Sequence, residues 1–168
     1  MKHLYAPWRG TYTIEAQEQK HLDKGCPFCL KDQKAAQENY VVKEYEHVLV
    51  LLNLYPYNPG HLLIVPKEHK AQLHEFSEQA RVELMHVITQ SVAVLEKTLG
   101  NSGTNVGINL GDEAAGGSIP EHLHVHVVPR WQGDTNFMPV VAETKQLSQD
   151  LNVVYEMVKK EFNTAQFE

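Results

Sequence analysis

The sequence predicts an α+β fold in which an antiparallel sheet of about five strands packs against two main helices. Three observations lead to this prediction. Five short segments are rich in Val, Leu, Ile and Tyr, and two longer segments repeat apolar residues every three or four positions. The strands and helices do not alternate regularly, as they would in a parallel sheet. With 168 residues, the chain is expected to form a single domain, 1–168.

The first three strands are expected before the long helix. Segments 40–45 and 47–54 are rich in Val, Leu and Tyr, which favour strands. Residues 55–60 read Tyr-Pro-Tyr-Asn-Pro-Gly, and their prolines and glycine favour a turn. The run His-Leu-Leu-Ile-Val at 61–65 predicts a third strand that ends at Pro66. The second and third strands are therefore expected to form an antiparallel hairpin.

The clearest helix is expected at 78–99. Its apolar residues recur at spacings of three and four, as on one face of a helix. Ser77 can cap its first turn, and Gly100 follows the last apolar position, where a helix commonly ends. The residues expected to face the sheet are Met85, Ile88, Val92, Leu95 and Leu99.

The second half of the chain supplies the remaining elements. A strand is expected at 104–110, a glycine-containing loop at 111–120, and a strictly alternating strand at 122–128. Residues 140–142 can extend a strand. A last amphipathic helix at 145–162 is expected to bury Leu147, Leu151, Val154, Val158 and Phe162.

Composition excludes several classes of protein. Lys and Arg number 15 against 21 Asp and Glu, a net charge of −6, so a broad nucleic-acid-binding face is not expected. The longest apolar run, 48–52, is far shorter than the ~20 residues of a membrane span. Residues 1–10 lack a hydrophobic signal-peptide core. Residues 1–25 are expected to form an N-terminal strap and loop, and residues 143–168 a C-terminal helical extension. We therefore expect a cytoplasmic protein without nucleic-acid or membrane partners.

Three of the ten histidines fall in one run, His-Leu-His-Val-His-Val-Val at 122–128. In a strand, His122, His124 and His126 share one face, and the apolar residues share the other. Burying three imidazoles is costly unless each has a partner. Three interpretations follow: a solvated histidine-rich face, a metal centre, or nucleophilic catalysis by a neutral imidazole that attacks phosphorus. The run alone does not separate the last two.

The residues around this run resemble the histidine triad superfamily of nucleotide hydrolases and transferases. Its motif is His-φ-His-φ-His-φ-φ, where φ is apolar, and residues 122–128 match every position. Pro-Gly-His at 59–61 and Val-Pro-Lys-Glu-His at 65–69 resemble an upstream motif of the superfamily. Ala-Pro-Trp-Arg at 6–9 and Gly-Asp-Thr-Asn-Phe-Met-Pro at 133–139 are most similar to bacterial phosphorylases of diadenosine tetraphosphate.

The resemblance implies a role for individual residues. His124 corresponds to the nucleophile that attacks the α-phosphorus and forms a nucleotidyl-histidine. His126 corresponds to the histidine that contacts the phosphate and the leaving group. His61 is expected either near the site or packed beneath the hairpin. The other substrate-binding positions implied are Asn53, beside the ribose hydroxyls, and Asn109, Gly117 and Ser118, beside the phosphates.

The loop before the histidine run bears on the second half of the reaction. Many superfamily members have Gly-Gln-Ser or Gly-Gln-Thr there, whereas residues 115–120 read Ala-Gly-Gly-Ser-Ile-Pro. Without the glutamine, space and N–H groups remain for a tetrahedral anion. The sequence therefore predicts phosphorolysis of diadenosine tetraphosphate to ATP and ADP. The alternatives are a hydrolase of dinucleoside polyphosphates or nucleoside phosphoramidates, and a nucleotide-binding or sensing module with little turnover.

The two cysteines of the chain, Cys26 and Cys29, form a single Cys-x-x-Cys motif with three interpretations. A redox pair needs a hydrophobic strand upstream, but residues 15–25 are polar. The pair can also be inert in the core, or bind zinc with two further ligands. By resemblance to superfamily members with a structural zinc away from the reacting phosphorus, those ligands are His69 and His122. No organic cofactor is expected, and the superfamily usually forms homodimers.

Overall fold

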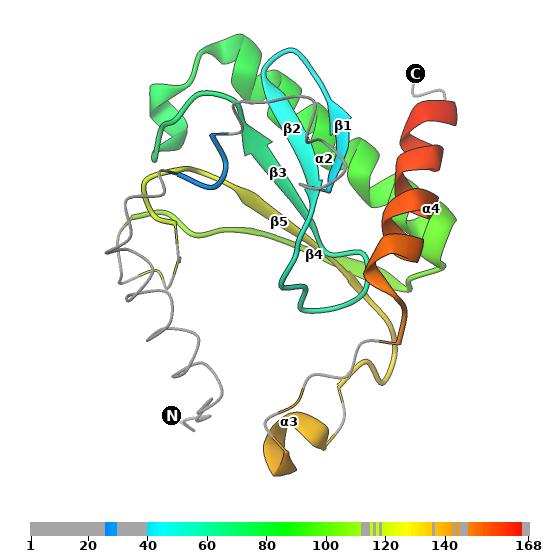
Figure 1. Cartoon of the computed structure of the whole chain (residues 1–168). Helices are drawn as coiled ribbons and strands as arrows, with labels where there is room; N and C mark the ends of the chain where they lie inside the picture. The colour runs from blue at the N-terminus through cyan, green and yellow to red at the C-terminus, as the bar shows by residue number, and fades with distance from the viewer. Residues whose placement is uncertain are drawn as a thin grey trace.

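A computed structural model gives the fold and describes residues 26–29, 40–111, 115, 117, 119–135, 137–142, 144 and 148–165. The predicted strap at 1–25 and Ser118 lie outside the described residues. The five predicted strands form one sheet (Figure 1). In chain order they are β1 (Val41–Glu44), β2 (Val48–Leu52), β3 (Leu62–Pro66), β4 (Gly103–Ile108) and β5 (Val125–Arg130).

The sheet is antiparallel throughout. Across the sheet the strand order is β1-β2-β3-β5-β4, and every neighbouring pair runs antiparallel. β3 and β5 are therefore neighbours, although the long helix and β4 separate them in the sequence. The sheet and its two main helices confirm the predicted α+β class.

β2 and β3 form the predicted hairpin, with Leu49 opposite Val65. Every residue of both strands is buried, which explains why their sequences are continuously apolar rather than alternating. Gly60, just before β3, has a φ of +79°, and a side chain there would collide with Leu99. The left-handed conformation favours glycine at this position, and any larger residue would also displace the Leu99 side chain.

The long helix α2 (Glu78–Leu99) has the predicted bounds. The Ser77 side chain accepts a hydrogen bond from the N–H of Ala80. At the other end, Gly100 has a left-handed φ of 62° and donates its N–H to the carbonyl of Glu96. The capping residues that were visible in the sequence therefore define both ends of this helix.

The face of α2 that packs on the sheet agrees with the predicted one except at Met85, since Ile88 and Leu95 are buried and Val92 and Leu99 pack against the core. Met85 is 64% exposed, so the prediction that it faces the sheet is wrong. Besides the predicted Ile88 and Leu95, the buried stripe includes Leu84, Val87 and Ser91. Ser91 can be buried because its hydroxyl donates to the carbonyl of Val87 at 2.7 Å. An apolar pattern does not reveal a buried serine, and the stripe is rotated towards it.

The last helix, α4 (Leu151–Thr164), begins later than predicted. Its N-cap is Asp150, whose carboxylate accepts bonds from the N–H groups of Asn152 and Val153. This cap starts the helix here rather than at residue 145. Of the predicted face, Leu147 lies outside the described residues. The buried residues of α4 are Val154, Tyr155, Val158 and Phe162.

Residues 140–142, which were predicted to extend a strand, do not do so. Residues 140 and 141 end α3 (Met138–Val141), a single helical turn. Pro139 lies at the start of this turn, where helical N–H groups have no partner and the missing N–H of proline costs nothing. The turn therefore overrides the strand preference of two adjacent valines.

The two faces of the sheet are covered differently. α2 packs across β2, β3 and β5, and α4 packs on β1 and α2, so both helices lie on one face (Figure 1). The main core lies between these helices and the sheet. On the opposite face is a smaller apolar cluster, whose buried members are Leu49, Leu51, Leu63 and Val65 and which also contacts Phe28. This second face carries the histidines.

Candidate active site

The histidine run lies on the sheet face opposite α2. β5 starts at Val125 rather than at residue 122, because the N–H of Leu123 bonds to the carbonyl of Lys70 (2.8 Å) instead of to a neighbouring strand. The predicted alternation still holds, since Leu123, Val125 and Val127 enter the main core. The other face presents His122 and His124, which are buried, and His126, which is half-buried.

His124 has a neutral ring with a lone pair at Nε2. Its Nδ1 lies 2.9 Å from the carbonyl oxygen of His122. A carbonyl oxygen can only accept, so we assign the ring hydrogen to Nδ1. Burial lowers the pKa of His124 below its ordinary value of 6.5, although this hydrogen bond opposes the shift. A neutral imidazole with a free Nε2 can act as a nucleophile or a base near neutral pH.

A hydrogen bond from His61 determines which ring nitrogen of His126 can donate a hydrogen bond to a substrate. Nδ1 of His61 accepts the backbone N–H of Tyr57 (3.1 Å) and lies 3.2 Å from the amide nitrogen of Asn53. The Asn53 oxygen accepts the N–H of Tyr55 at 3.0 Å, which holds that amide in place. The ring hydrogen of His61 is therefore on Nε2, which lies 3.0 Å from Nδ1 of His126. The hydrogen of a neutral His126 is then on Nε2, where it can be donated to an anionic oxygen.

His61 is the functional candidate whose role the sequence left open between the site and the packing. It is 0% exposed. Burial first, and then the charges of His126 and His124, lower its pKa to about 3. Burial first, and then His124, lowers the pKa of His126 to about 4. The signal in the sequence was a histidine at the start of the wholly apolar run 62–65, because a buried imidazole needs a polar partner.

These buried histidines predict a loss of stability in mild acid. In the folded protein the pKa is about 3 for His61 and about 4 for His126, whereas an unfolded histidine titrates near ~6.5. Between about pH 3 and 6.5 the unfolded chain binds more protons, so the free energy of unfolding falls as the pH falls. His61→Gln removes one such group. In this variant we expect the slope of the free energy of unfolding against pH to be shallower by up to about 1.4 kcal/mol per pH unit.

Urea unfolding of both proteins at about pH 7, 6 and 5 measures this difference. Any acid effect from the other histidines is common to the two proteins, so the difference in slope reports on the substituted residue. Equal slopes would contradict the assignment of a neutral, buried His61.

The structure brings Asn109 and Gly117 close together on the side of His126. A Cβ placed on Gly117 would lie 3.6 Å from the Cβ of Asn109, which is an ordinary contact. Asn109 and His126 line the same cavity. Ser118, the other residue predicted beside the phosphates, lies outside the described residues. A small residue at position 117 keeps the backbone accessible next to an amide side chain.

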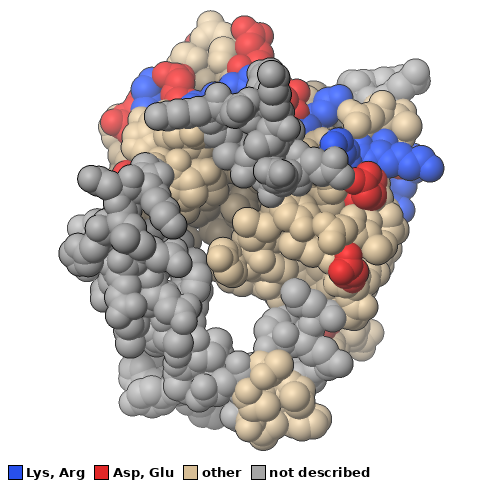
Figure 2. Space-filling model, in the orientation of Figure 1, with Lys and Arg blue, Asp and Glu red and all other residues tan. Residues whose placement is uncertain are grey.

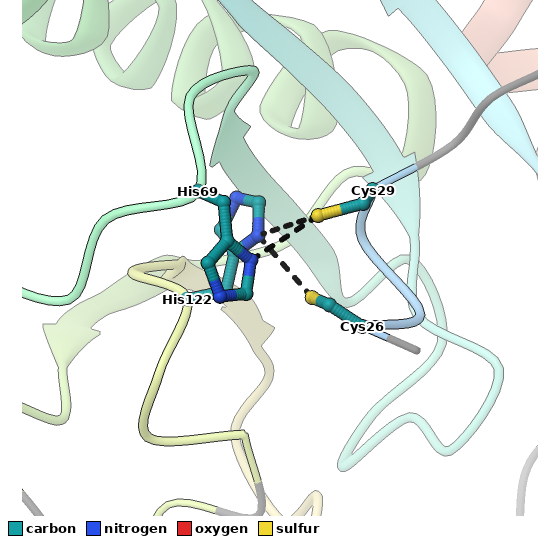
Figure 3. A group of neighbouring side chains, drawn as sticks. All are labelled: Cys26, Cys29, His69 and His122. Atoms are coloured by element: carbon teal, nitrogen blue, oxygen red, sulfur yellow. Dashed lines mark hydrogen bonds between the residues drawn. The ribbon is translucent and has the colours of Figure 1, made fainter. Parts of the chain in front are cut away.

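The four predicted zinc ligands come together from three separate segments (Figure 3). Sγ of Cys26 lies 3.3 Å from Nδ1 of His122, and Sγ of Cys29 lies 3.2 Å from Nδ1 of His69 and 3.7 Å from Nδ1 of His122. Tetrahedral zinc, with bonds of ~2.3 Å to sulfur and ~2.0 Å to nitrogen, implies S···N separations of roughly 3.6 Å. The observed separations fit such a tetrahedron, so this cluster can hold a metal ion.

The orientation of His122 supports a metal ligand. Its Nε2 lies 2.8 Å from the carbonyl oxygen of Pro66, so Nε2 carries the hydrogen and Nδ1 presents a lone pair to both sulfur atoms. Metal-binding histidines typically donate their second ring N–H in this way. The geometry favours a metal centre over the redox and the inert interpretations of the cysteine pair.

Phe28, between the two cysteines, connects the metal centre to His124. Its ring centroid lies 5.5 Å from that of His122 and 5.0 Å from that of His124. The same ring packs on the smaller apolar cluster of the sheet. The turn that carries the cysteines therefore also supplies an apolar wall against the His124 ring.

Asp134, which follows β5, forms an ion pair with Arg130 and a hydrogen bond to Asn58 in the loop before β3. The Asp134 carboxylate accepts two bonds from the Arg130 guanidinium and one of 2.8 Å from the amide of Asn58, which is buried. The Arg130 hydrogen bonds hold the pKa of the Asp134 carboxyl well below its usual range. Asn58 follows Tyr57, whose ring stacks on His126 with centroids 5.8 Å apart. The ion pair therefore fixes the loop that covers His126.

The charged surface is mixed on the face that Figure 2 shows. Lys and Arg side chains are interspersed with Asp and Glu along the upper edge and on the α4 side, while the middle of the face is largely uncharged. Among the described helices, none is long and apolar enough to cross a membrane.

The sheet topology, the histidine run and the cavity beside it define a class of protein. Residues 34–133 match the HIT domain family, which is more than half of the chain. The chain therefore belongs to the histidine triad (HIT) family.

The comparisons with individual proteins are more specific. An AP-4-A phosphorylase from Mycobacterium tuberculosis is 39% identical over 153 residues, which cover 89% of this chain and 78% of that protein. Protein hit from Bacillus subtilis is 30% identical, with coverage of 68% of this chain and 77% of that one. A solved structure of a Zn-bound histidine triad family protein from Mycobacterium smegmatis superposes with a TM-score of 0.64 at 24% identity, over 83% of this chain and 94% of that chain. The similarity to this solved structure concerns the fold alone.

Proposed function

We propose that this chain is a nucleotidyl transferase that cleaves diadenosine tetraphosphate with inorganic phosphate, which yields ATP and ADP. The observation that carries the proposal is the 39% identity, over 89% of the chain, to an AP-4-A phosphorylase. The site geometry supports it, because the rings of His124, with a free Nε2, and of His126, with an Nε2–H, are neighbours whose centroids lie 5.0 Å apart. These are the two groups that an in-line displacement at phosphorus requires.

In the proposed first step, the lone pair of His124 Nε2 attacks the α-phosphorus. The N–P bond forms while the bond from phosphorus to the bridging oxygen breaks, and ATP leaves. The His126 N–H hydrogen-bonds the bridging oxygen and stabilises the charge that develops there. The carbonyl of His122 holds the Nδ1–H of His124 and stabilises the positive charge of the adenylylated ring. Asn53 is proposed to contact the ribose hydroxyls.

In the proposed second step, an oxygen of inorganic phosphate attacks the same phosphorus. The N–P bond breaks, its electron pair returns to His124 Nε2, and ADP forms. Asn109, Gly117 and Ser118 are proposed to border the acceptor. Gly117 leaves open backbone beside Asn109, and backbone N–H groups bind tetrahedral anions well.

We propose zinc as the ion of the metal centre, bound by Cys26, Cys29, His69 and His122. Two thiolates and two imidazoles are a donor set that zinc prefers. The Zn-bound family member from Mycobacterium smegmatis also supports this choice. When bound, zinc supplies a structural cross-link. The chain's own contribution is Phe28, which the cross-linked turn holds against His124.

The proposal predicts that the products depend on inorganic phosphate. With phosphate in excess, we expect ATP and ADP in equal amounts, because phosphate accepts the adenylyl group. Without phosphate, turnover should slow by about tenfold or more, as water is a poorly held acceptor. Chromatography of the nucleotides with and without phosphate measures both quantities. Formation of AMP and ATP at one rate, whatever the phosphate concentration, would favour the hydrolase alternative.

Gly117→Gln is the matched variant for this experiment. A side chain has ordinary contact distance at this position, so we expect the variant to fold. Glutamine would occupy the proposed phosphate position, and the ratio of ADP to AMP should fall. Phosphate-dependent ADP formation at the wild-type level in this variant would contradict the proposed acceptor position.

A nucleotide-binding module with little turnover is distinguished by the covalent intermediate. Mass spectrometry of the intact protein after mixing with diadenosine tetraphosphate should show one added adenylyl group, which a mere binder would lack.

The proposal includes a homodimer. The outer edge of β4, which is unpaired within the part of the chain described, offers a strand surface for it.

A further inference from the structure

A cavity of about 500 Å³ lies on the β4–β5 side of His126. His126 and Val128 of β5 form its floor together with Asn105 and Gly107, which face them from β4. Tyr57 and Thr135 also line it. Its volume is in the range of small-molecule sites. The cavity therefore adjoins the proposed reacting centre but extends beyond it along the sheet.

The charges in this cavity are paired. The Arg130 guanidinium gives two hydrogen bonds to Asp134 and a third to Asn105, so its charge is neutralised within the protein. The pKa of His126, about 4, keeps its ring neutral near pH 7. The other described lining groups are amides, the hydroxyl of Thr135, the phenol of Tyr57, and glycine or aliphatic side chains. Among the described residues that line the cavity, none offers a polyphosphate chain an unpaired positive charge, whereas a neutral, planar, hydrogen-bonding group would find suitable partners there.

The shape of the cavity also suits a flat group. Gly107 leaves the floor open, since a Cβ placed there would meet no atom within 4 Å. The Tyr57 ring is nearly parallel to that of His126, with an interplanar angle of 16°, and this partly exposed ring gives the cavity lining an aromatic surface. Aromatic surfaces bind nucleobases by stacking.

We propose that this cavity binds the leaving nucleoside, at the end of the polyphosphate remote from the attacked phosphorus. His126 is the group assigned to the leaving oxygen, so a cavity that begins at His126 lies on the leaving-group side. Binding there makes the protein prefer dinucleoside polyphosphates to mononucleoside polyphosphates. The inference rests on the proposed function, because it takes the reacting phosphorus to lie at His124.

The test compares two ligands that differ only at this end. Diadenosine tetraphosphate and adenosine tetraphosphate carry the same adenylyl group and the same phosphate chain, and only the first has a second nucleoside.

Three variants complete the test. Gly107→Leu fills the floor of the cavity, and the φ of Gly107 does not strain a larger residue. Gly103→Leu is the matched control, since Gly103 lies on the same strand, also faces open space, and does not line the cavity. Thr135→Trp, on an exposed position of the rim, narrows the cavity without a change in the sheet.

We expect the ratio of kcat/KM for diadenosine tetraphosphate to that for adenosine tetraphosphate to fall by about tenfold in Gly107→Leu and in Thr135→Trp. Gly103→Leu should keep the wild-type ratio. Damage to His126 would lower both activities together and leave the ratio in place. An unchanged ratio in both cavity variants would overturn the proposal.

Binding separates this inference from the proposed reaction. Calorimetry on the His124→Ala protein, which needs no turnover, should show tighter binding of diadenosine tetraphosphate than of adenosine tetraphosphate, with the difference lost in the cavity variants. If the His124→Ala protein with an unaltered cavity binds both ligands equally well, the cavity assignment is overturned even if phosphorolysis is found. A wild-type protein that binds with this difference but cleaves neither ligand would instead contradict the proposed function.

Discussion

We expect His124→Ala to reduce turnover of diadenosine tetraphosphate by about four orders of magnitude or more, while the protein stays folded and binds nucleotide. The variant lacks the only proposed nucleophile, the Nε2 lone pair that the hydrogen bond to the His122 carbonyl leaves free. Direct attack by phosphate on the tetraphosphate would then have to occur without the covalent step. Initial rates from nucleotide chromatography measure the loss, and intact-protein mass spectrometry should find no adenylyl adduct.

His126→Ala provides the comparison for this experiment. It removes a hydrogen-bond donor rather than a nucleophile, so we expect a smaller loss, about 10² to 10³ in kcat. Thermal unfolding checks that each variant is folded, since His124 also packs on Phe28. Near-normal turnover in His124→Ala would refute covalent catalysis through this residue.

Loss of a zinc ligand should have the largest effect on stability. The purified chain should contain about one zinc per molecule, and Cys29→Ser should lower the free energy of unfolding by about 3 kcal/mol or more, which is about 10 °C in Tm for a chain of this size. The reason is that metal binding contributes directly to folding when its ligands come from distant segments. We expect nucleotide affinity to change less than stability. Calorimetric unfolding and metal analysis measure these effects.

Two controls show whether the effect belongs to the metal centre. His74 is exposed and lies outside the cluster, so His74→Ala should change Tm by only about 1–2 °C. A chelator should destabilise the wild-type protein strongly and Cys29→Ser hardly at all. A chain that is purified without chelators, contains no zinc and has two freely titratable thiols in the native state would contradict the zinc assignment.

Several features were determined locally and could be read from the sequence. The bounds of α2 follow from Ser77 and Gly100, which satisfy or redirect backbone groups within a few residues. The β2–β3 hairpin follows from two apolar runs across a Pro- and Gly-containing turn. The two faces of the histidine run follow from the period of two in extended chain. Each depends on contacts between residues near one another in the chain.

Predictions failed where the apolar or alternating pattern of a segment did not indicate a hydrogen bond or packing contact that decides its structure. Met85 fits the apolar repeat of α2 but is exposed, because the helix turns the face with Ser91 to the sheet. The strand predicted from residue 122 starts at Val125, because the N–H of Leu123 finds a partner in the loop after β3. Burial of Ser91 depends on a hydrogen bond within the helix, to Val87, whereas the partner of Leu123, Lys70, is distant in sequence.

The sequence by itself therefore determined the α+β class, the hairpin, the long helix and the chemical identity of the candidate site residues. The tertiary structure alone decided which of those residues meet. Cys29 and His69 are 40 positions apart, His61 and His126 are 65 apart, and Cys26 and His122 are 96 apart. Their contacts depend on the strand order that makes β3 and β5 neighbours. Local backbone preferences do not specify that order, since it arises from the burial of the whole sheet against α2 and α4. The proton positions on His61, His124 and His126 follow from those contacts, and so does the chemistry that each ring can perform.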